Sequence, residues 1–195
     1  MTAIVRKLNL GAHVTASVGW LGAVLAFLVL SIAGIRGADA ATVRGAYVAM
    51  NLIGEFVIMP LSFLALGTGL TLALGTEWGL IRYYWVLVKF ALTLGATALL
   101  LLHQFTAVAE AARLASAEAP DGGGNLAALG MQLVVDATLA IVVLVTATAL
   151  SIFKPGGKIV WQRPSTKMWI AAVAIIVGLI VLRHLMGGGM PHHGR

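Results

Sequence analysis

The sequence contains no cysteine and little charge. None of its 195 residues is a cysteine, and only 10% are Asp, Glu, Lys or Arg. Without cysteine the chain cannot form disulfides, iron–sulfur clusters, thiolate zinc sites or a cysteine nucleophile. Soluble globular domains carry about 25% charged residues. The scarcity of charge therefore excludes an ordinary soluble domain.

Long apolar stretches take the place of charge. Hydrophobic residues make up 60% of the chain, and the mean hydropathy is +0.98. A bilayer core about 30 Å thick needs roughly 20 mostly apolar residues per helix. Five stretches meet this requirement, at about 8–35, 46–74, 82–105, 125–153 and 167–186. They lack the alternation of membrane β-barrel strands, so we expect an all-α integral membrane helical bundle with about five transmembrane helices.

Two segments need separate interpretation: the first apolar stretch, which could be a signal peptide, and the segment that follows the third stretch. Arg6 and Lys7 precede the first stretch and a small-x-small pattern at 38–40 follows it, as in a signal peptide. The stretch is much longer than the roughly 7 to 15 residues of a signal core, so we expect a retained first helix. The Ala- and Glu-rich segment 110–119 predicts a short helical continuation of the third helix.

The predicted domain organisation is a single domain followed by a short tail. A single transmembrane domain is expected over residues 1–186. A short glycine- and histidine-rich tail follows at 187–195. No second domain and no repeat of fixed period is evident.

Basic residues predict the orientation, because they tend to stay in cytoplasmic loops. The segment between the fourth and fifth stretches holds four basic residues and no acid: Lys154, Lys158, Arg163 and Lys167. We therefore expect the N-terminus inside and the C-terminus outside, in the cell (inner) membrane. The net charge of +6 is spread over loops and helix ends without interleaved aromatics, so nucleic acid is not an expected partner. The lipid bilayer is the expected partner, and a homo-oligomer or a larger membrane complex stays open.

Three charged residues lie inside the apolar stretches, where unpaired charge is costly. Glu55 and Lys89 fall on successive antiparallel helices at what we expect to be comparable depth, so an ion pair is expected. Asp136 has Gln132 one turn away as a hydrogen-bond partner. This charge network could be structural, could relay protons, or could contact haem propionates.

Histidines are the candidate ligands, because neutral imidazole is the commonest metal or haem-iron ligand in a chain without cysteine. The predicted topology places His13 near the inner face and both His103 and His184 near the outer face. A haem between helices needs ligands at matching depth, which favours His103 with His184. His13 would then need another axial ligand, such as Met168, or an open coordination position. The alternative is that each histidine is a hydrogen-bonded packing residue.

Two short segments carry a resemblance to known families. The segment 13–22, in which His13 is followed seven residues later by Trp20 and then by small residues, resembles the first helix of many small bacterial membrane proteins. The segment 84–89, with apolar residues from there to His103, resembles their third helix. The chain most resembles a family of uncharacterised multi-pass membrane proteins. It is more distantly similar to copper-resistance D-type membrane domains and J-type protoporphyrinogen oxidase.

The resemblance covers roughly residues 8–105, and it implies a cofactor held between helices. Haem b is the cofactor first implied, copper is the alternative, and the absence of any cofactor stays open. The apolar segment 23–30 departs from the oxidase pattern, so enzyme activity also stays open.

The functional hypothesis is therefore haem or metal binding for electron transfer or for haem and metal handling. Its cofactor-binding candidates are His103, His184, His13, Lys89 and Glu55, with the three histidines as metal ligands. The alternatives are a small proton-coupled transporter that uses Glu55, Lys89 and Asp136, or an accessory subunit of a membrane complex.

Overall fold

The computed structural model describes residues 1–76, 79–116, 123–155 and 157–158. Six α-helices and two π-helical segments account for nearly all of them: α1 (Ala3–Arg36), α2 (Ala40–Ile53), η1 (Gly54–Ile58), α3 (Met59–Gly75), α4 (Tyr84–His103), η2 (Gln104–Val108), α5 (Ala109–Ser116) and α6 (Gly123–Phe153). The predicted fifth transmembrane stretch at 167–186, with His184, and the tail at 187–195 lie outside the described residues.

These segments join into four long helices. Because η1 connects α2 to α3 and η2 connects α4 to α5 without a break, each group runs as one helix. Four helices are long and apolar enough to cross a membrane: Ala3–Arg36, Ala40–Gly75, Tyr84–Ser116 and Asn125–Phe153. The chain is thus a multi-pass integral membrane protein with a helical bundle, as the sequence predicts.

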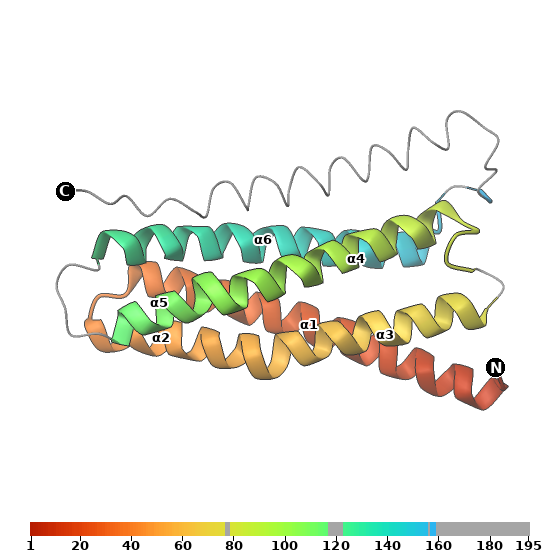
Figure 1. Cartoon of the computed structure of the whole chain (residues 1–195), viewed down its shortest axis with the longest axis horizontal. Helices are drawn as coiled ribbons and strands as arrows, with labels where there is room; N and C mark the ends of the chain where they lie inside the picture. The colour runs from red at the N-terminus through yellow and green to blue at the C-terminus, as the bar shows by residue number, and fades with distance from the viewer. Residues whose placement is uncertain (77–78, 117–122, 156, 159–195) are drawn as a thin grey trace.

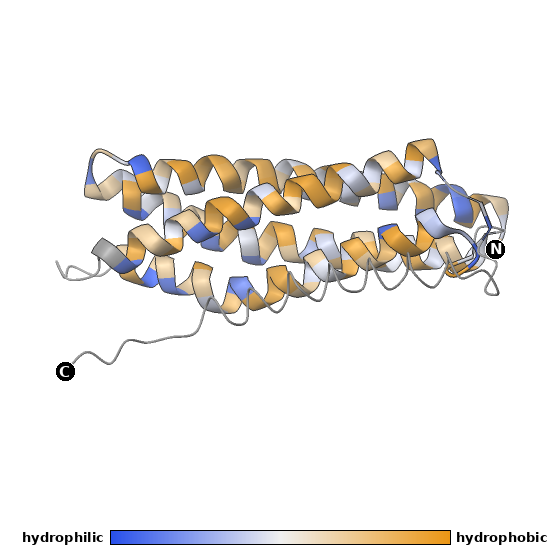
Figure 2. Ribbon diagram, turned by 90° about the horizontal axis from the view of Figure 1, so that it is seen from above, coloured by the Kyte–Doolittle hydropathy of each residue, from blue (hydrophilic) through white to orange (hydrophobic). Residues whose placement is uncertain are grey.

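The four helices run up and down along one axis. Their inter-helix connections place the start of α1, the end of α3, the start of α4 and the end of α6 at one end of the bundle (Figure 1). We call this the N-terminal end, and the opposite end the far end. Hydrophobic residues predominate along the helices (Figure 2). Exposed side chains include Leu25, Phe56, Phe105 and Val142, which is the surface that lipid accommodates.

The core is organised around α1, which packs against α2, α3 and α6. Its buried residues recur every three or four positions, the period of one helical face: Ala16, Trp20, Val24, Phe27, Ser31 and Gly34. Tyr47 and Met50 of α2 and Leu133 of α6 belong to the same buried cluster. Val108 of η2 and Ala111 of α5 also belong to it, so one continuous core joins all four long helices.

The two π-helical segments interrupt the long helices in the middle. Pro60, at the start of α3, has no N–H group, and its ring conflicts with the carbonyl four residues earlier in an α-helix. The π-helical segment η1 ends immediately before Met59. The change from α-helical to π-helical hydrogen bonding therefore occurs in the turn where Pro60 disturbs the α-helical pattern. The segment η2 contains no proline, and the sequence does not predict it.

Candidate functional site

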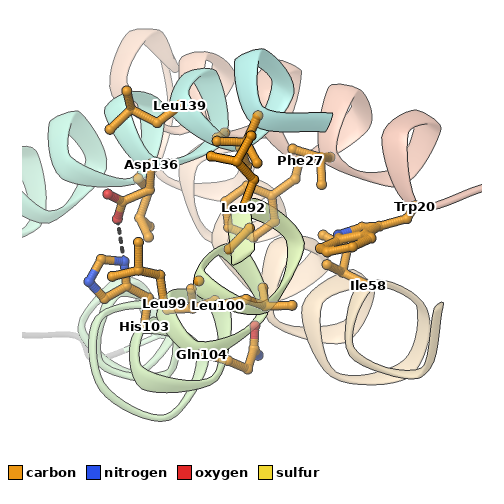
Figure 3. A pocket seen from close by; sticks show the side chains of 18 residues that line it. Trp20, Phe27, Ile58, Leu92, Leu99, Leu100, His103, Gln104, Asp136 and Leu139 are labelled. Carbon is orange, nitrogen blue, oxygen red and sulfur yellow. Dashed lines mark ion pairs between the residues drawn. The ribbon is translucent and has the colours of Figure 1, made fainter. Parts of the chain in front are cut away.

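A histidine and an aspartate meet between α4 and α6 (Figure 3). The Nδ1 atom of His103 lies 2.6 Å from the Oδ2 atom of Asp136, and the side chains are only 14% and 16% exposed. The contact is an ion pair when the imidazole carries a second proton. It restricts the orientation of the ring, and Nε2 lies on the side away from Asp136 (Figure 3).

The pair lies well inside its helices, which corrects the predicted position of His103. The sequence places His103 near the outer face, because the third apolar stretch ends at about residue 105. The helix runs without a break through η2 and α5 to Ser116, so His103 is near the middle of a 33-residue helix. Asp136 is likewise near the middle of the 29-residue helix Asn125–Phe153. The sequence suggests Gln132 as its partner, and the structure pairs it with His103.

The expected ion pair between Glu55 and Lys89 is wrong. Glu55 lies roughly five turns before Gly75, whereas Lys89 lies roughly one turn after Tyr84, and both of these helix ends are at the N-terminal end. Their depths therefore differ, and no ion pair joins these two described side chains. Glu55 is exposed, and the Lys89 Nζ atom lies 5.5 Å from the centre of the Trp85 ring.

Two amide side chains lie beside the histidine–aspartate pair. The Nε2 group of Gln104 donates to the Asn51 backbone oxygen at 3.2 Å and to its Oδ1 atom at 3.1 Å. Gly54 leaves the space that Gln104 fills, because a Cβ atom there would overlap with Oε1 and lie 2.7 Å from Cδ. We call the set Asn51, Gln104, His103 and Asp136 the polar layer.

Sequence reasoning missed Asn51 and Gln104. The available signal was an uncharged amide inside each of two long apolar stretches, since an amide without a hydrogen-bond partner is costly in lipid. The prediction considered the charged residues inside these stretches and not the amides.

A cavity of about 140 Å³ adjoins the polar layer. Its wall comes from α1, η1, α4, η2 and α6, and it includes Trp20, Phe27 and Ile58 besides the polar His103, Gln104 and Asp136 (Figure 3). Cavities that enclose drug-sized ligands measure roughly 300–1,000 Å³. An engineered cavity of about 150 Å³ binds benzene, so this cavity matches a single ring and is far too small for a porphyrin.

His13 lies in a separate polar contact between α1 and α3. Its Nδ1 atom is 3.0 Å from the Ala65 oxygen and 3.1 Å from the Thr68 Oγ1 atom. One turn earlier, the Asn9 Nδ2 group donates to the Thr68 oxygen at 3.2 Å and to the Thr71 Oγ1 atom at 2.6 Å. These bonds hold two helices together, which agrees with the packing alternative for His13. The suggested axial partner Met168 lies outside the described residues.

The described part of the chain contains no group of three or more His, Asp or Glu residues arranged to hold a metal ion. The structure brings together His103 and Asp136, and it separates them from His13 and Lys89. The described donor set is thus one imidazole oriented by one carboxylate.

Comparisons of the chain with protein-family models, with curated proteins and with solved structures found no match in any of the three. The resemblance carried by segments 13–22 and 84–89 therefore stays a prediction.

Proposed function

We propose that this membrane protein binds haem b through the Nε2 atom of His103, with Asp136 holding the imidazole in place, and serves electron transfer or haem handling. The observation that carries the proposal is the 2.6 Å contact between His103 Nδ1 and Asp136 Oδ2. A histidine that binds a metal almost always donates its other ring N–H to a carboxylate, a carbonyl or water. Removing such a partner typically weakens metal binding 10- to 100-fold.

The cavity beside the polar layer is too small for a porphyrin. The haem would therefore lie outside it, on the side of His103 where Nε2 faces away from Asp136 (Figure 3). The donors favour haem over an ion held by protein alone. Haem iron needs only one or two axial side chains, because the porphyrin supplies the other ligands. A copper ion would need several protein ligands in one place, and the described residues offer one histidine there. The sequence predicts His184 as the second axial ligand.

The depth of the pair supports a functional role. Ionisable residues inside a membrane are expensive to maintain and usually mark a cofactor, ion or proton site. Both His103 and Asp136 are near the middle of long apolar helices. An imidazole on one helix that meets a carboxylate on another also fixes the distance and register between α4 and α6.

An absorption spectrum of the purified protein tests the proposal. The protein is expressed with a haem precursor and with copper in the medium, purified in detergent, and assayed for a Soret band and for bound metal. We expect a Soret band in the wild type, its loss in His103→Ala, and haem binding weakened about 10- to 100-fold in Asp136→Asn. His13→Ala is the matched control and should keep the wild-type spectrum.

Two results would overturn haem binding. One is a wild-type protein without a Soret band after adequate haem supply. The other is a His103→Ala variant that folds and keeps the wild-type spectrum. Bound copper without haem would support the copper alternative instead.

A proton relay is the second candidate, because an imidazole in contact with a carboxylate inside a membrane can pass a proton. Purified protein in liposomes with an imposed pH gradient and a trapped pH-sensitive dye tests it. The relay predicts proton flux that falls in Asp136→Asn and His103→Ala but not in His13→Ala. Liposomes that remain as tight to protons as protein-free ones would exclude it.

For orientation we propose that the N-terminal end of the bundle faces the cytoplasm. The described residues at that end include five basic side chains and no acid: Arg6, Lys7, Arg82, Lys154 and Lys158. Because the chain has no cysteine, single cysteines at Ala38 and Thr76 can be labelled with an impermeant maleimide. Intact cells should label position 38 and leave position 76 unlabelled until lysis. The reverse pattern would invert the topology.

A further inference from the structure

The cavity beside the polar layer contains an unused hydrogen-bond acceptor. Gln104 is 4% exposed and belongs to the cavity wall. Its Oε1 atom is buried and has no hydrogen-bond partner among the described residues. In Figure 3 this oxygen points from η2 toward the side chains of Leu100 and Ile58. A buried acceptor without a partner is costly, so it marks a place where a donor is expected.

The orientation of the Gln104 amide follows from its neighbours. The backbone oxygen of Asn51 is an acceptor only, and it lies 3.2 Å from the Gln104 Nε2 atom. Rotating the amide by half a turn would place two oxygens against each other. The NH₂ group therefore faces Asn51, and the oxygen remains on the other side.

The rest of the wall around Gln104 selects an apolar occupant. Ile58, Leu100 and Val108 line this part of the cavity, and Trp20 and Phe27 supply aromatic faces. A buried water needs two to four polar partners, which this part of the wall does not provide. A volume of about 140 Å³ corresponds to one aromatic ring.

We propose that this cavity binds a small single-ring molecule of the phenol class, with its apolar ring among the aromatic and aliphatic side chains and its hydroxyl donating to the Gln104 Oε1 atom. Such a molecule dissolves in the bilayer. Leu139 belongs both to the cavity wall and to the exposed surface of α6, so a molecule in the lipid meets the rim of the cavity directly. His103 belongs to the same cavity wall, but the proposed recognition uses Gln104 and needs no metal, so it does not depend on haem binding.

The test uses 4-fluorophenol and fluorobenzene as probes. Their binding to the full-length protein in lipid nanodiscs is measured by fluorine NMR, and partition into empty nanodiscs is subtracted. We expect saturable binding of one 4-fluorophenol per chain, about three- to tenfold tighter than fluorobenzene, which is the net value of one hydrogen bond.

Variants assign the binding to the cavity. Ala140→Leu places a larger side chain in the wall and should weaken both probes at least about tenfold. Ala128→Leu makes the same change at an exposed position of α6 that does not line the cavity, and it should leave binding unchanged. Gln104→Leu should retain fluorobenzene and lose the preference for 4-fluorophenol.

Each contrary result bears on a defined part of the proposal. If Ala140→Leu binds both probes like the wild type, the cavity is not the site. If the wild type binds fluorobenzene as tightly as 4-fluorophenol, the Gln104 acceptor does not recognise a donor. The wild-type comparison needs no variant, so it decides the second point even if Gln104→Leu does not fold.

Discussion

Gly54 has no side chain at the point where α2 passes into η1, and Gln104 of the neighbouring long helix fills that space. The close approach lets the Gln104 amide reach Asn51. It also brings the first residues of the two π-helical segments together. π-Bulges are frequent at functional sites, and here they adjoin the histidine–aspartate pair.

Gly54→Ala tests this arrangement. The added methyl group would overlap with Gln104, so we expect a loss of about 1–3 kcal/mol in stability, typical of overpacking. Thermal unfolding in detergent measures the effect. Gly22→Ala is the matched control, since a Cβ atom there meets nothing within 4 Å, and alanine favours a helix by up to about 1 kcal/mol. Equal stability of the two variants would contradict the role of Gly54.

Asp39 gives a pH-dependent prediction outside the spans. Its carboxylate caps α2 by accepting bonds from the Thr42 backbone N–H at 2.8 Å and the Thr42 hydroxyl at 2.7 Å. These bonds lower the pKa of Asp39. A lowered folded-state pKa means that the stabilising contribution is present above the ordinary value and is lost as the pH falls through the lowered one, below about pH 4.

We therefore expect the Thr42 amide to lose protection from hydrogen exchange below about pH 4 in the wild type, after correction for the intrinsic exchange rate. Asp39→Asn caps a helix without titrating, so its Thr42 amide should stay protected over the same range. Identical pH profiles for the two proteins would contradict the assignment.

At the residue scale, the sequence predicted His103 and Asp136 as important but not that they meet. Their contact depends on the vertical register between α4 and α6, which the apolar pattern of each helix leaves open. The same uncertainty explains the wrong pairing of Glu55 with Lys89.

Among the elements, Tyr47 of α2 joins three helices. Its ring is 1% exposed and lies between two glycines, Gly34 of α1 and Gly130 of α6. A Cβ atom on Gly34 would lie 2.9 Å from the Tyr47 Cζ atom, and one on Gly130 would overlap with the hydroxyl. Small residues let helices approach closely in membranes, and here they make room for a rigid aromatic ring.

Gly130→Ala should therefore destabilise the bundle by about 1–3 kcal/mol. Tyr47→Phe removes the hydroxyl that the new methyl group meets, so the double variant should recover part of the loss. Thermal unfolding of both single variants and of the double variant gives the coupling energy. Strictly additive effects would show that Tyr47 and Gly130 do not contact each other as described.

At the scale of the elements, sequence patterns predicted the long helices but not the π-helical segments within them. Length and apolar content predicted the four described spans, and the composition of 110–119 predicted the helical continuation that α5 provides at Ala109–Ser116. The π-helical segments were not predicted. They arise from packing between helices, as at Gly54 and Gln104, and η2 has no proline to indicate it.

At the scale of the whole molecule, the length of one helix implies that the polar layer lies inside the bilayer. Lys89 and Glu110 belong to one continuous helix, and about 30 Å of helix rise separates them, which is the thickness of the hydrocarbon core. His103 lies between these two charges. Composition alone predicted membrane insertion, but the depth of the site became clear only when the full length of this helix was known.

Depth measurement by spin labelling tests this central claim most directly. Single cysteines at the exposed positions Leu102, Val135 and Phe56, which neighbour His103, Asp136 and Glu55, carry a nitroxide in lipid vesicles. Labels at the exposed Val5 and Ile35 near the two ends of α1 serve as shallow references. We expect the three central labels to collide often with oxygen and rarely with a water-soluble nickel complex. If the nickel complex reaches them as readily as the reference labels, the polar layer does not lie within the membrane.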